Sequence, residues 1–369
     1  MEWSVCAHKN LHRREQAVMK ILQIGLGGFG KNHLRAWAQT GRVRDLFVAD
    51  LSQGRLKEAQ DLFGIPPERL SSDYRQFLPQ ADIVDIVTPS DSHAEICEEA
   101  LELGKDVFVE KPMTMTVAEA DRIAAAVERS RRILQVGYYY RYHPITKYVR
   151  EQVRLGQLGA LRYLSGQFMG FKRARTDVGV THTDGIHFID LFNDLIGETP
   201  REAYAVIRDH FGRGLEDFSI VLLRYPSGVV VKVESGYVQP GNWVDRVVPN
   251  AMTTKDITLV GEKRTIRADF EIDKVEVFEV RHELQNGIWT PVHGPCTSPR
   301  LRSVTPVELV ALELESFLES VAKREIPSPN VTDSGTVLAR IMEAVYRSAE
   351  SGRPATVEPV GEAVGLAKT

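Results

Sequence analysis

The residues best suited to chemistry follow a short apolar run, in which Glu110, Lys111 and Pro112 come directly after residues 107–109. Such a run after Gly104, rich in β-branched and aromatic residues, is typical of a buried parallel strand. Ligands gather at the carboxyl ends of strands of this kind. We therefore expect Glu110 and Lys111 at the rim of a ligand crevice, where the lysine could donate a proton. The alternative is a surface Glu-Lys pair that ends a strand.

A second candidate group lies in the segment 181–196, which carries Asp184, His187 and Asp190 at intervals of three. This segment should be helical, and the spacing places the three side chains roughly on one face. A histidine there could be a general base, oriented by a neighbouring acid that raises its pKa. Two alternatives stay open: a histidine of the core, and a metal site, although positions three apart diverge from a single centre.

A glycine-rich turn comes before both groups. Gly25-Leu26-Gly27-Gly28-Phe29-Gly30 joins a strand signal at 21–24 to a helical stretch at 31–39. In this setting the glycines permit a tight turn, the approach of backbone to a pyrophosphate, and close packing of helix on strand. The helix N-terminus then faces the phosphates. The turn therefore predicts a dinucleotide site.

An acid ends the next strand signal, because Asp50 follows residues 46–49. This position, about twenty residues after the glycine turn, is where a carboxylate binds the ribose 2′-hydroxyl. Asp50 therefore favours NAD over NADP; its structural alternative is a helix N-cap. Arg55 is close enough in sequence to reach a 2′-phosphate, which leaves NADP open.

Strand and helix signals alternate up to residue 137. Residues 83–87 predict a strand that ends at Thr88 and Pro89, and a helix follows from His93 to Leu103. His93 at this rim could contact the cofactor or be solvated. Helical stretches at 56–63 and 117–129 and a last strand at 133–137 complete six strands, which is an α/β Rossmann fold with a doubly wound parallel sheet.

The pattern changes after Tyr138, where an aromatic stretch at 138–144 marks the domain crossing, a common place for substrate pockets. Alternation with a period of two then predicts an α+β domain with a largely antiparallel open sheet, with turns at 226–228 and 286–287. Lys172, Arg173 and Arg175 could bind a substrate carboxylate or phosphate, or form a solvated loop. The predicted strands cover 161–169, 202–208, 218–225, 229–237, 257–260 and 275–280, and two amphipathic helices cover 308–323 and 334–351.

Composition limits the class of protein. The 369 residues carry a net charge of −4, with 43% hydrophobic and 26% charged residues, which argues against a nucleic-acid partner. No stretch is long and apolar enough for a membrane span. Three dispersed cysteines suggest neither a disulfide framework nor a zinc site and fit a cytoplasmic protein. Residues 1–18 do not read as a secretory signal, and we expect a disordered preamble with Met19 as a candidate start of translation.

Together the glycine turn, the acid after the second strand, Glu-Lys-Pro and the histidine helix resemble the glucose-fructose oxidoreductase, inositol dehydrogenase and rhizopine catabolism family, Gfo/Idh/MocA. The resemblance spans about residues 19–354. It implies an NAD(P)-dependent oxidoreductase for sugars, sugar acids, cyclitols and nucleotide sugars, with no metal. It also implies a homodimer or homotetramer formed through the open sheet, a Lys111–Pro112 bond that is often cis, and Lys111 near nicotinamide and substrate.

The resemblance also implies the division of the chain and the site. The Rossmann domain covers 19–143, the substrate and oligomerisation domain 144–305, and 306–369 return to the Rossmann domain. One departure is that many relatives have an aspartate four residues before the helix histidine, where this chain has Thr183. The catalytic candidates are Lys111, His187 and Asp184, and the cofactor-binding candidates are Gly25, Gly27, Gly28, Phe29, Gly30, Asp50, Thr88, Pro89, His93, Glu110 and Lys111.

Two other functions stay open. A non-catalytic sensor of NAD(H) would keep the glycines and Asp50 but would not need Lys111. An enzyme that uses bound NAD transiently to eliminate or hydrolyse a glycosidic bond would turn over without net reduction of the cofactor. Lys111 and His187 together favour an enzyme, and sequence does not rank them as the base.

Overall fold

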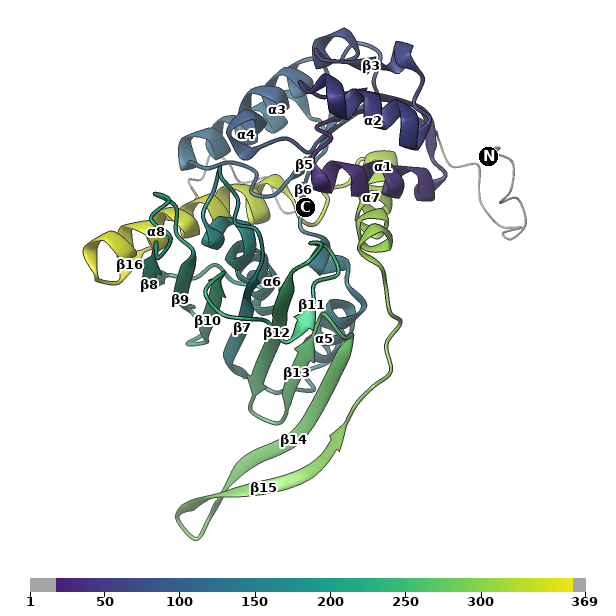
Figure 1. The fold of residues 1–369 in the computed structure, drawn as a ribbon. Helices are drawn as coiled ribbons and strands as arrows, with labels where there is room; N and C mark the ends of the chain where they lie inside the picture. Colours follow the sequence, from purple (N-terminus) through teal and green to yellow (C-terminus); the bar gives the residue numbers. More distant parts are fainter. Residues whose placement is uncertain (1–17, 361–369) are drawn as a thin grey trace.

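The computed structural model describes residues 18–360, so most of the predicted preamble lies outside the described residues. The first part of the chain forms a six-stranded parallel sheet in the order β3-β2-β1-β4-β5-β6 (Figure 1). This order confirms the doubly wound sheet, and the order in which strands are added reverses between β1 and β4, where ligands bind in such folds. The strands are β1 (Met19–Ile24), β2 (Val43–Ala49), β3 (Leu70–Ser71), β4 (Ile83–Ile86), β5 (Asp106–Glu110) and β6 (Leu134–Gly137).

Helices cover both faces of this sheet, as parallel strands require. Strand β5 is buried along its whole length, which explains its unbroken apolar run. Helix α4 begins with a capping box between Thr116 and Glu119. The helices are α1 (Gly28–Thr40), α2 (Gln53–Phe63), α3 (His93–Glu102) and α4 (Val117–Ser130), with short turns η1 (Pro67–Arg69), η2 (Tyr74–Gln76) and η3 (Ser90–Ser92).

The second sheet has ten strands, in the order β15-β14-β13-β12-β7-β10-β9-β8-β16, with β11 paired to β12. All its pairs are antiparallel except β7 with β10, which confirms the predicted largely antiparallel sheet. Strands β11, β13, β15 and β16 were not predicted from the sequence. The strands are β7 (Leu161–Phe171), β8 (Glu202–Arg208), β9 (Phe218–Arg224), β10 (Val230–Gly236), β11 (Trp243–Val244), β12 (Met252–Gly261), β13 (Thr265–Asp269), β14 (Lys274–Gln285), β15 (Ile288–Thr297) and β16 (Ala355–Thr356).

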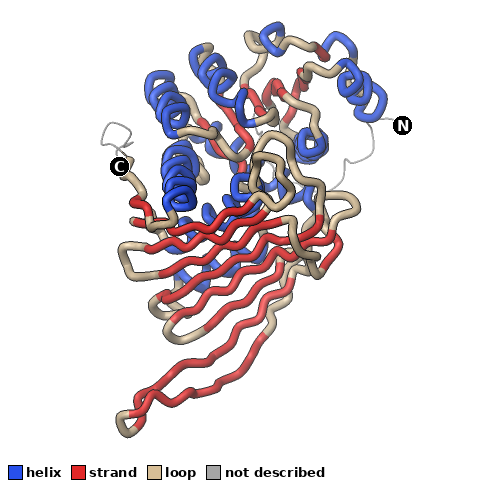
Figure 2. The backbone as a smooth tube through the Cα atoms, turned by 60° about the vertical axis from the view of Figure 1, so that its left-hand side comes forward, coloured by secondary structure: helices blue, strands red, loops and turns tan. Residues whose placement is uncertain are grey.

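Helices pack on one face of the second sheet, and its other face is open (Figure 2). Helix α7 contacts α1 and shares a core with Trp37 and Phe108, whereas α8 lies mainly along β8 and also contacts α4. The remaining helical elements are η4 (Tyr139–Tyr142), α5 (Pro144–Arg154), η5 (Thr181–Gly185), α6 (Ile186–Ile196), α7 (Pro306–Lys323), η6 (Val331–Thr336) and α8 (Val337–Ser351).

A two-stranded ribbon projects from the body of the protein (Figure 1). It is formed by β14 and β15, which turn at Asn286-Gly287, and β15 pairs with β14 alone. Three apolar side chains near the turn, Leu284, Ile288 and Trp289, are 60–68% exposed. The sheet therefore ends in a solvated arm on one side and in the two-residue strand β16 on the other.

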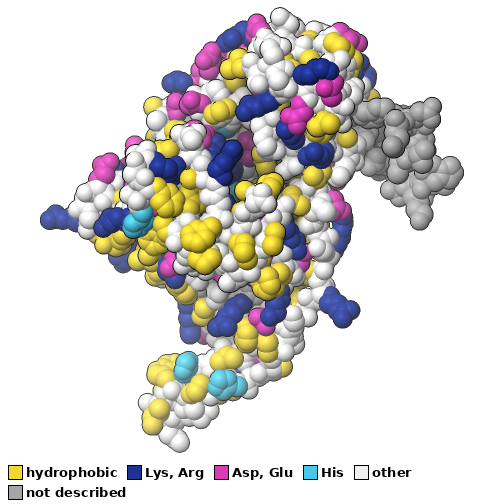
Figure 3. Space-filling view, viewed as in Figure 1, with side chains coloured by type: hydrophobic (Ala, Val, Ile, Leu, Met, Phe, Trp, Pro, Cys, Tyr) yellow, Lys and Arg dark blue, Asp and Glu magenta, His cyan; other side chains and the backbone are white. Residues whose placement is uncertain are grey.

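The visible surface mixes acidic and basic side chains, without a large area of one sign (Figure 3). Within residues 18–360 no helix has the length and apolar character needed to cross a bilayer.

Candidate active site

The glycine turn is shaped by two close backbone contacts. Gly25 has φ +102°, and a Cβ atom there would lie 2.4 Å from the Val87 carbonyl oxygen. A Cβ on Gly30 would lie 2.3 Å from the Gly25 carbonyl oxygen, so helix and turn could not pack as they do. In contrast, a Cβ on Gly27 or Gly28 would meet nothing within 4 Å. The start of α1 is thus an open backbone cradle, which suits a pyrophosphate at a helix N-terminus.

These contacts predict opposite behaviour for two alanine variants. Gly30→Ala should lower the free energy of unfolding by about 1–3 kcal/mol, because its methyl group meets backbone that cannot move aside. Gly27→Ala should leave stability unchanged but weaken NADH binding by about tenfold, since its methyl group occupies the cradle. Urea denaturation and NADH fluorescence titration measure the two effects. Equal stability of the two variants would contradict the packing role of Gly30.

Asp50 joins the glycine turn to the end of β2. Its carboxylate accepts hydrogen bonds from the backbone N–H of Leu26 at 2.7 Å and of Ser52 at 2.8 Å. Arg55 approaches the same carboxylate at 3.4 Å. The N-cap of α2 is Ser52, so the alternative of Asp50 as the helix cap is wrong. The carboxylate lies beside the turn, and Arg55 is held next to it.

Lys111 reaches from the first sheet to the helical segment of the second domain. It follows β5, forms a cis peptide bond with Pro112, and its Nζ donates a hydrogen bond to the Thr183 carbonyl oxygen at 2.5 Å. Burial lowers the pKa of Lys111 to about 8, although the nearby Asp184 carboxylate opposes this. The side-chain amine can therefore accept a proton, and its ammonium form can release one, near neutral pH.

Glu110 and His93 lie under Lys111 rather than at an exposed rim. Glu110 is 5% exposed, so the alternative of a surface Glu-Lys pair is wrong. His93 is buried, and its ring nitrogens lie 3.0 Å from the carbonyl oxygens of Thr88 and Pro112. The alternative of a solvated His93 is therefore wrong as well. His93 ties the loop of Thr88 and the exposed Pro89 to the loop that carries Lys111.

The segment 181–196 is helical as predicted: a π-helical turn, η5, leads into α6. His187 is buried among the rings of Tyr138, Tyr139, Tyr140 and Phe168, with centroids 5.1–6.2 Å away. Its Nδ1 is buried and has no hydrogen-bond partner among the described residues. Burial lowers the pKa of His187 well below its usual value, and the charges of neighbouring lysines add to this. His187 is thus a neutral imidazole, and its Nδ1 has no partner in the described part of the chain.

The two acids of this segment pair with cations. Asp184 accepts a hydrogen bond from Lys172 Nζ at 2.7 Å, and Asp190 binds Arg141 with both oxygens, at 2.6 and 2.7 Å. Asp190 is therefore held by Arg141, and Asp184 by Lys172. Nor does the metal alternative find support, because both carboxylates pair with cations and no group of metal-ligating side chains occurs within the described chain.

The basic run after β7 divides between two environments. Lys172 lies in the site, paired with Asp184 and 4.5 Å from the centre of the Phe168 ring. Arg175 pairs with Asp177, and Arg173 is exposed. Lys172 therefore lies among the candidate catalytic side chains, where it pairs with Asp184. Arg173 fits the predicted solvated loop.

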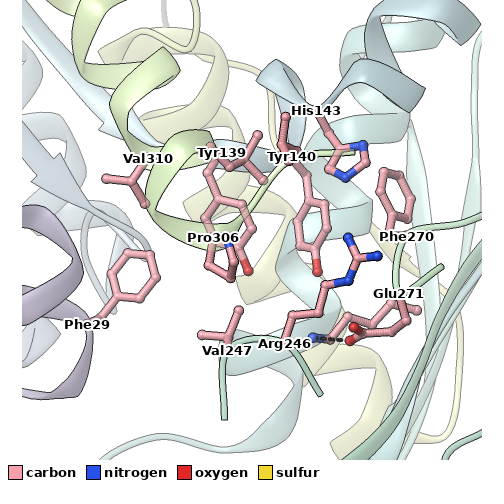
Figure 4. A pocket seen from close by; sticks show the side chains of 13 residues that line it. Phe29, Tyr139, Tyr140, His143, Arg246, Val247, Phe270, Glu271, Pro306 and Val310 are labelled. Atoms are coloured by element: carbon pink, nitrogen blue, oxygen red, sulfur yellow. Dashed lines mark ion pairs between the residues drawn. The ribbon is translucent and has the colours of Figure 1, made fainter. Parts of the chain in front are cut away.

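A pocket lies at the seam between the two domains (Figure 4). Tyr139 and Tyr140 line it and also contact His187, so the cavity adjoins the candidate site. On its floor Lys255 Nζ lies 2.5 Å from Glu271 Oε1. The sequence marked the aromatic stretch as a pocket seam but did not identify the individual lining residues. They are Phe29, Tyr139, Tyr140, His143, Arg246, Val247, Lys255, Phe270, Glu271, Val304, Pro306, Leu309 and Val310.

Tyr237 and Lys255 were also missed as site residues. The buried Tyr237 hydroxyl has no hydrogen-bond partner in the described part of the chain, and the ring lies 5.7 Å from Lys172 Nζ. Lys255 is buried 5.0 Å from the Phe168 ring. Tyr237 directly follows β10, whereas Lys255 lies within β12, and neither carries a local sequence signal that could have identified it.

Comparisons with known proteins agree with this geometry. Residues 19–138 match the family model described as "Oxidoreductase family, NAD-binding Rossmann fold", and residues 146–267 match the GFO/IDH/MocA C-terminal domain. A D-apiose dehydrogenase of Paraburkholderia graminis is 28% identical over 91% of this chain and 88% of its own. An inositol 2-dehydrogenase of Burkholderia cenocepacia is 26% identical over 94% and 97%. A levoglucosan dehydrogenase in complex with NADH has a TM-score of 0.80 at 22% identity, covering 94% and 100%.

Proposed function

The chain belongs to the GFO/IDH/MocA family of oxidoreductases, and from that membership we propose that it is a dehydrogenase of carbohydrate-like alcohols. It transfers hydride between NAD and a secondary alcohol or ketone of a sugar, sugar acid, cyclitol or nucleotide sugar. The observation that carries the proposal is the contact of Lys111 Nζ with the Thr183 carbonyl, which brings a titratable lysine from the first sheet to the helix of His187. Relatives named for D-apiose and inositol support the substrate class.

The residues that would hold NAD fit its shape and charge. The cradle at Gly27 and Gly28 is open where a pyrophosphate would lie, and Phe29 and Gly30 continue α1 behind it. Asp50 would accept a hydrogen bond from the adenine-side ribose. Thr88 and Pro89 would border the nicotinamide half, with His93 and Glu110 supporting that edge from below. The bound nicotinamide supplies the hydride chemistry, and the protein supplies orientation and proton transfer.

Different protonation states give Lys111 and His187 different roles. Lys111, with a pKa of about 8, moves the hydroxyl proton of the substrate. His187 stays neutral because its pKa is well below the usual value, and its ring hydrogen-bonds the substrate oxygen. Asp184 holds Lys172 beside the substrate and favours the charged form of Lys111. This division of roles supports Lys111 as the base.

Asp50 should determine the choice of cofactor. We expect Asp50→Asn to keep the acceptor for the Leu26 N–H but to remove the charge that repels a 2′-phosphate. The ratio of kcat/KM for NAD to that for NADP should fall by about tenfold, or about 1.4 kcal/mol. Arg55→Ala is the matched control, which should lower NADP use without affecting NAD. An unchanged ratio in Asp50→Asn would contradict the role of Asp50.

The open face of the second sheet supports a further part of the proposal, namely that copies of the chain associate through it as a homodimer or homotetramer in the cytoplasm. Exposed side chains on this face include Tyr204 and Val230, whose neighbours Ala203 and Val231 are buried on the helix side. Sedimentation equilibrium tests this: a monomer at micromolar concentration would contradict it.

The function is tested by offering purified protein a panel of sugars, sugar acids, cyclitols and nucleotide sugars and following reduction of NAD and NADP separately. We expect reduction of NAD with at least one member. Tight binding of NADH without turnover would point to a sensor. Product formation from glycosides without added NAD or net reduction would point to transient use of bound cofactor. Either outcome would overturn the proposed dehydrogenase.

A further inference from the structure

Four buried ionisable side chains lie behind Lys111, and the proposed chemistry uses none of them directly. His33 of α1, Asp85 of β4, and Glu313 of α7 are fully buried, and Glu110 of β5 is 5% exposed. His33 Nδ1 lies 3.0 Å from an Asp85 oxygen, and its Nε2 lies 3.2 Å from Glu110 Oε1. Since each ring nitrogen faces a carboxylate, the geometry suits a protonated imidazolium that donates in both directions.

The electrostatics agree with this geometry. Burial alone would lower the pKa of His33, but the carboxylates of Asp85 and Glu110 outweigh it and raise the pKa to about 10. Glu313 is the remaining acid of the cluster, and burial raises its pKa well above the usual value, so it is neutral. His33 therefore provides a permanent positive charge between two carboxylates. An apolar side chain of similar size would leave Glu110 as an unpaired buried charge.

The cluster is connected to Lys111 through Glu110. While Glu110 Oε1 faces His33, its Oε2 accepts the backbone N–H of Lys111 at 3.2 Å. On the other side the carboxylate is pressed against β6, because a Cβ on Gly137 would lie 2.5 Å from Oε1. The Glu110 carboxylate is thus held by the ion pair with His33, by the backbone N–H of Lys111 and by its close contact with Gly137. These three contacts leave it a single position.

We propose that His33 is a positioning residue for Lys111, acting through Glu110. It lies one helical turn after Gly30, so the helix that opens on the cofactor cradle also fixes the lysine that moves the proton. Phe29 of the cradle packs edge-on against the His33 ring, with centroids 5.3 Å apart. The inference rests on the proposed function, since it gives His33 a role only if Lys111 takes part in proton transfer.

The test measures the titration of Lys111 without any substrate. Acetic anhydride acetylates only the neutral amine, so the extent of labelling of the Lys111 peptide against pH, read by mass spectrometry, gives a midpoint. The charged and titratable groups near Lys111 are Asp184, Glu110, Lys172, Arg175, His182 and His187. His33→Gln removes the charge that compensates Glu110, and the midpoint should rise from about 8 by about one unit.

Two further variants show whether a change in the Lys111 midpoint comes from the charge on Glu110 or from a general loss of stability. Glu110→Gln retains an acceptor for the Lys111 N–H but removes the negative charge, so the midpoint should move downward. Trp37→Phe is the matched control, because Trp37 donates to Asp85 at 2.6 Å on the far side of the cluster. It should lower the melting temperature while leaving the midpoint and turnover unchanged. If His33→Gln fails to fold, Glu110→Gln against Trp37→Phe carries the same comparison.

Turnover of the panel substrate that the wild type oxidises fastest provides the second measurement. His33→Gln should lower kcat by about tenfold or more with KM for NAD nearly unchanged. A lower melting temperature with an unmoved midpoint and wild-type kcat would overturn the inference, because His33 would then be structural only. Failure of the proposed function is distinguishable: it appears as wild-type turnover in Lys111→Met, whatever the midpoint in His33→Gln.

Discussion

Lys111→Met should lower kcat by about 10²- to 10⁴-fold, which is the range that a positioned general acid or base contributes. The thioether fills most of the lysine volume but cannot move a proton or donate to the Thr183 carbonyl. NADH affinity should change little, because the backbone cradle at Gly27 and the carboxylate of Asp50 follow other strands, β1 and β2. Stopped-flow turnover and NADH fluorescence titration measure the two quantities. Wild-type turnover in this variant would contradict the role of Lys111.

The dependence of kcat on pH also tests the role of Lys111. Alcohol oxidation needs the neutral amine as proton acceptor, so kcat should rise as pH increases through the Lys111 pKa of about 8. Ketone reduction needs the ammonium as proton donor, and its kcat should fall over the same range. Lys111→Arg is the control: its guanidinium keeps the charge but does not release a proton, so oxidation should stay slow at high pH. A profile independent of pH in the wild type would contradict the assignment.

Asp190→Ala should destabilise the protein by about 3–5 kcal/mol, because it leaves a buried guanidinium without its main partner. Arg141 and Asp190 are only 5% and 1% exposed. Arg141 also contacts Asp194 and Ser334, so it joins η4 to α6 and to η6. Urea denaturation of the variant and the wild type gives the difference in the free energy of unfolding.

The control for Asp190→Ala is an ion pair on the surface. Glu202→Ala removes a partner from Arg224, which is 71% exposed, so the change should be about 0–1 kcal/mol. Similar losses in the two variants would contradict the structural importance of the Arg141–Asp190 pair. If Asp190→Ala instead lost turnover at low temperature without losing stability, Asp190 would have a role in the active site.

The first sheet could be predicted from the sequence because its signals are local. Gly25 and Gly30 are five positions apart in the sequence, and the strand before Lys111 is a continuous apolar run. The missed strands lacked such signals. β13 alternates between buried and more exposed residues, but it is only five residues long and has just two apolar side chains, Ile266 and Ala268. β15 is mostly exposed and interrupted by proline, so it lacks the alternation of a half-buried strand.

The partners of the site residues could not be predicted because they are distant in sequence. Spacing placed Asp184, His187 and Asp190 on one helix face, but it does not show what the face meets. Asp190 meets Arg141, 49 residues earlier, and Glu110 meets His33, 77 residues earlier. Each carboxylate pairs with the cation that the tertiary fold brings to it, and this pairing separated the acids from the imidazole.

The projecting ribbon has a consequence for the way copies of this chain can meet. Its outer strand contains Pro291 and Pro295, which have no backbone N–H, and the opposite edge of the sheet is only two residues long. A sheet with edges of this kind is poorly suited to growth by addition of another chain's strand, which is how β-sheet proteins aggregate. The protein can thus present a broad sheet and a long solvated arm while resisting polymerisation edge to edge.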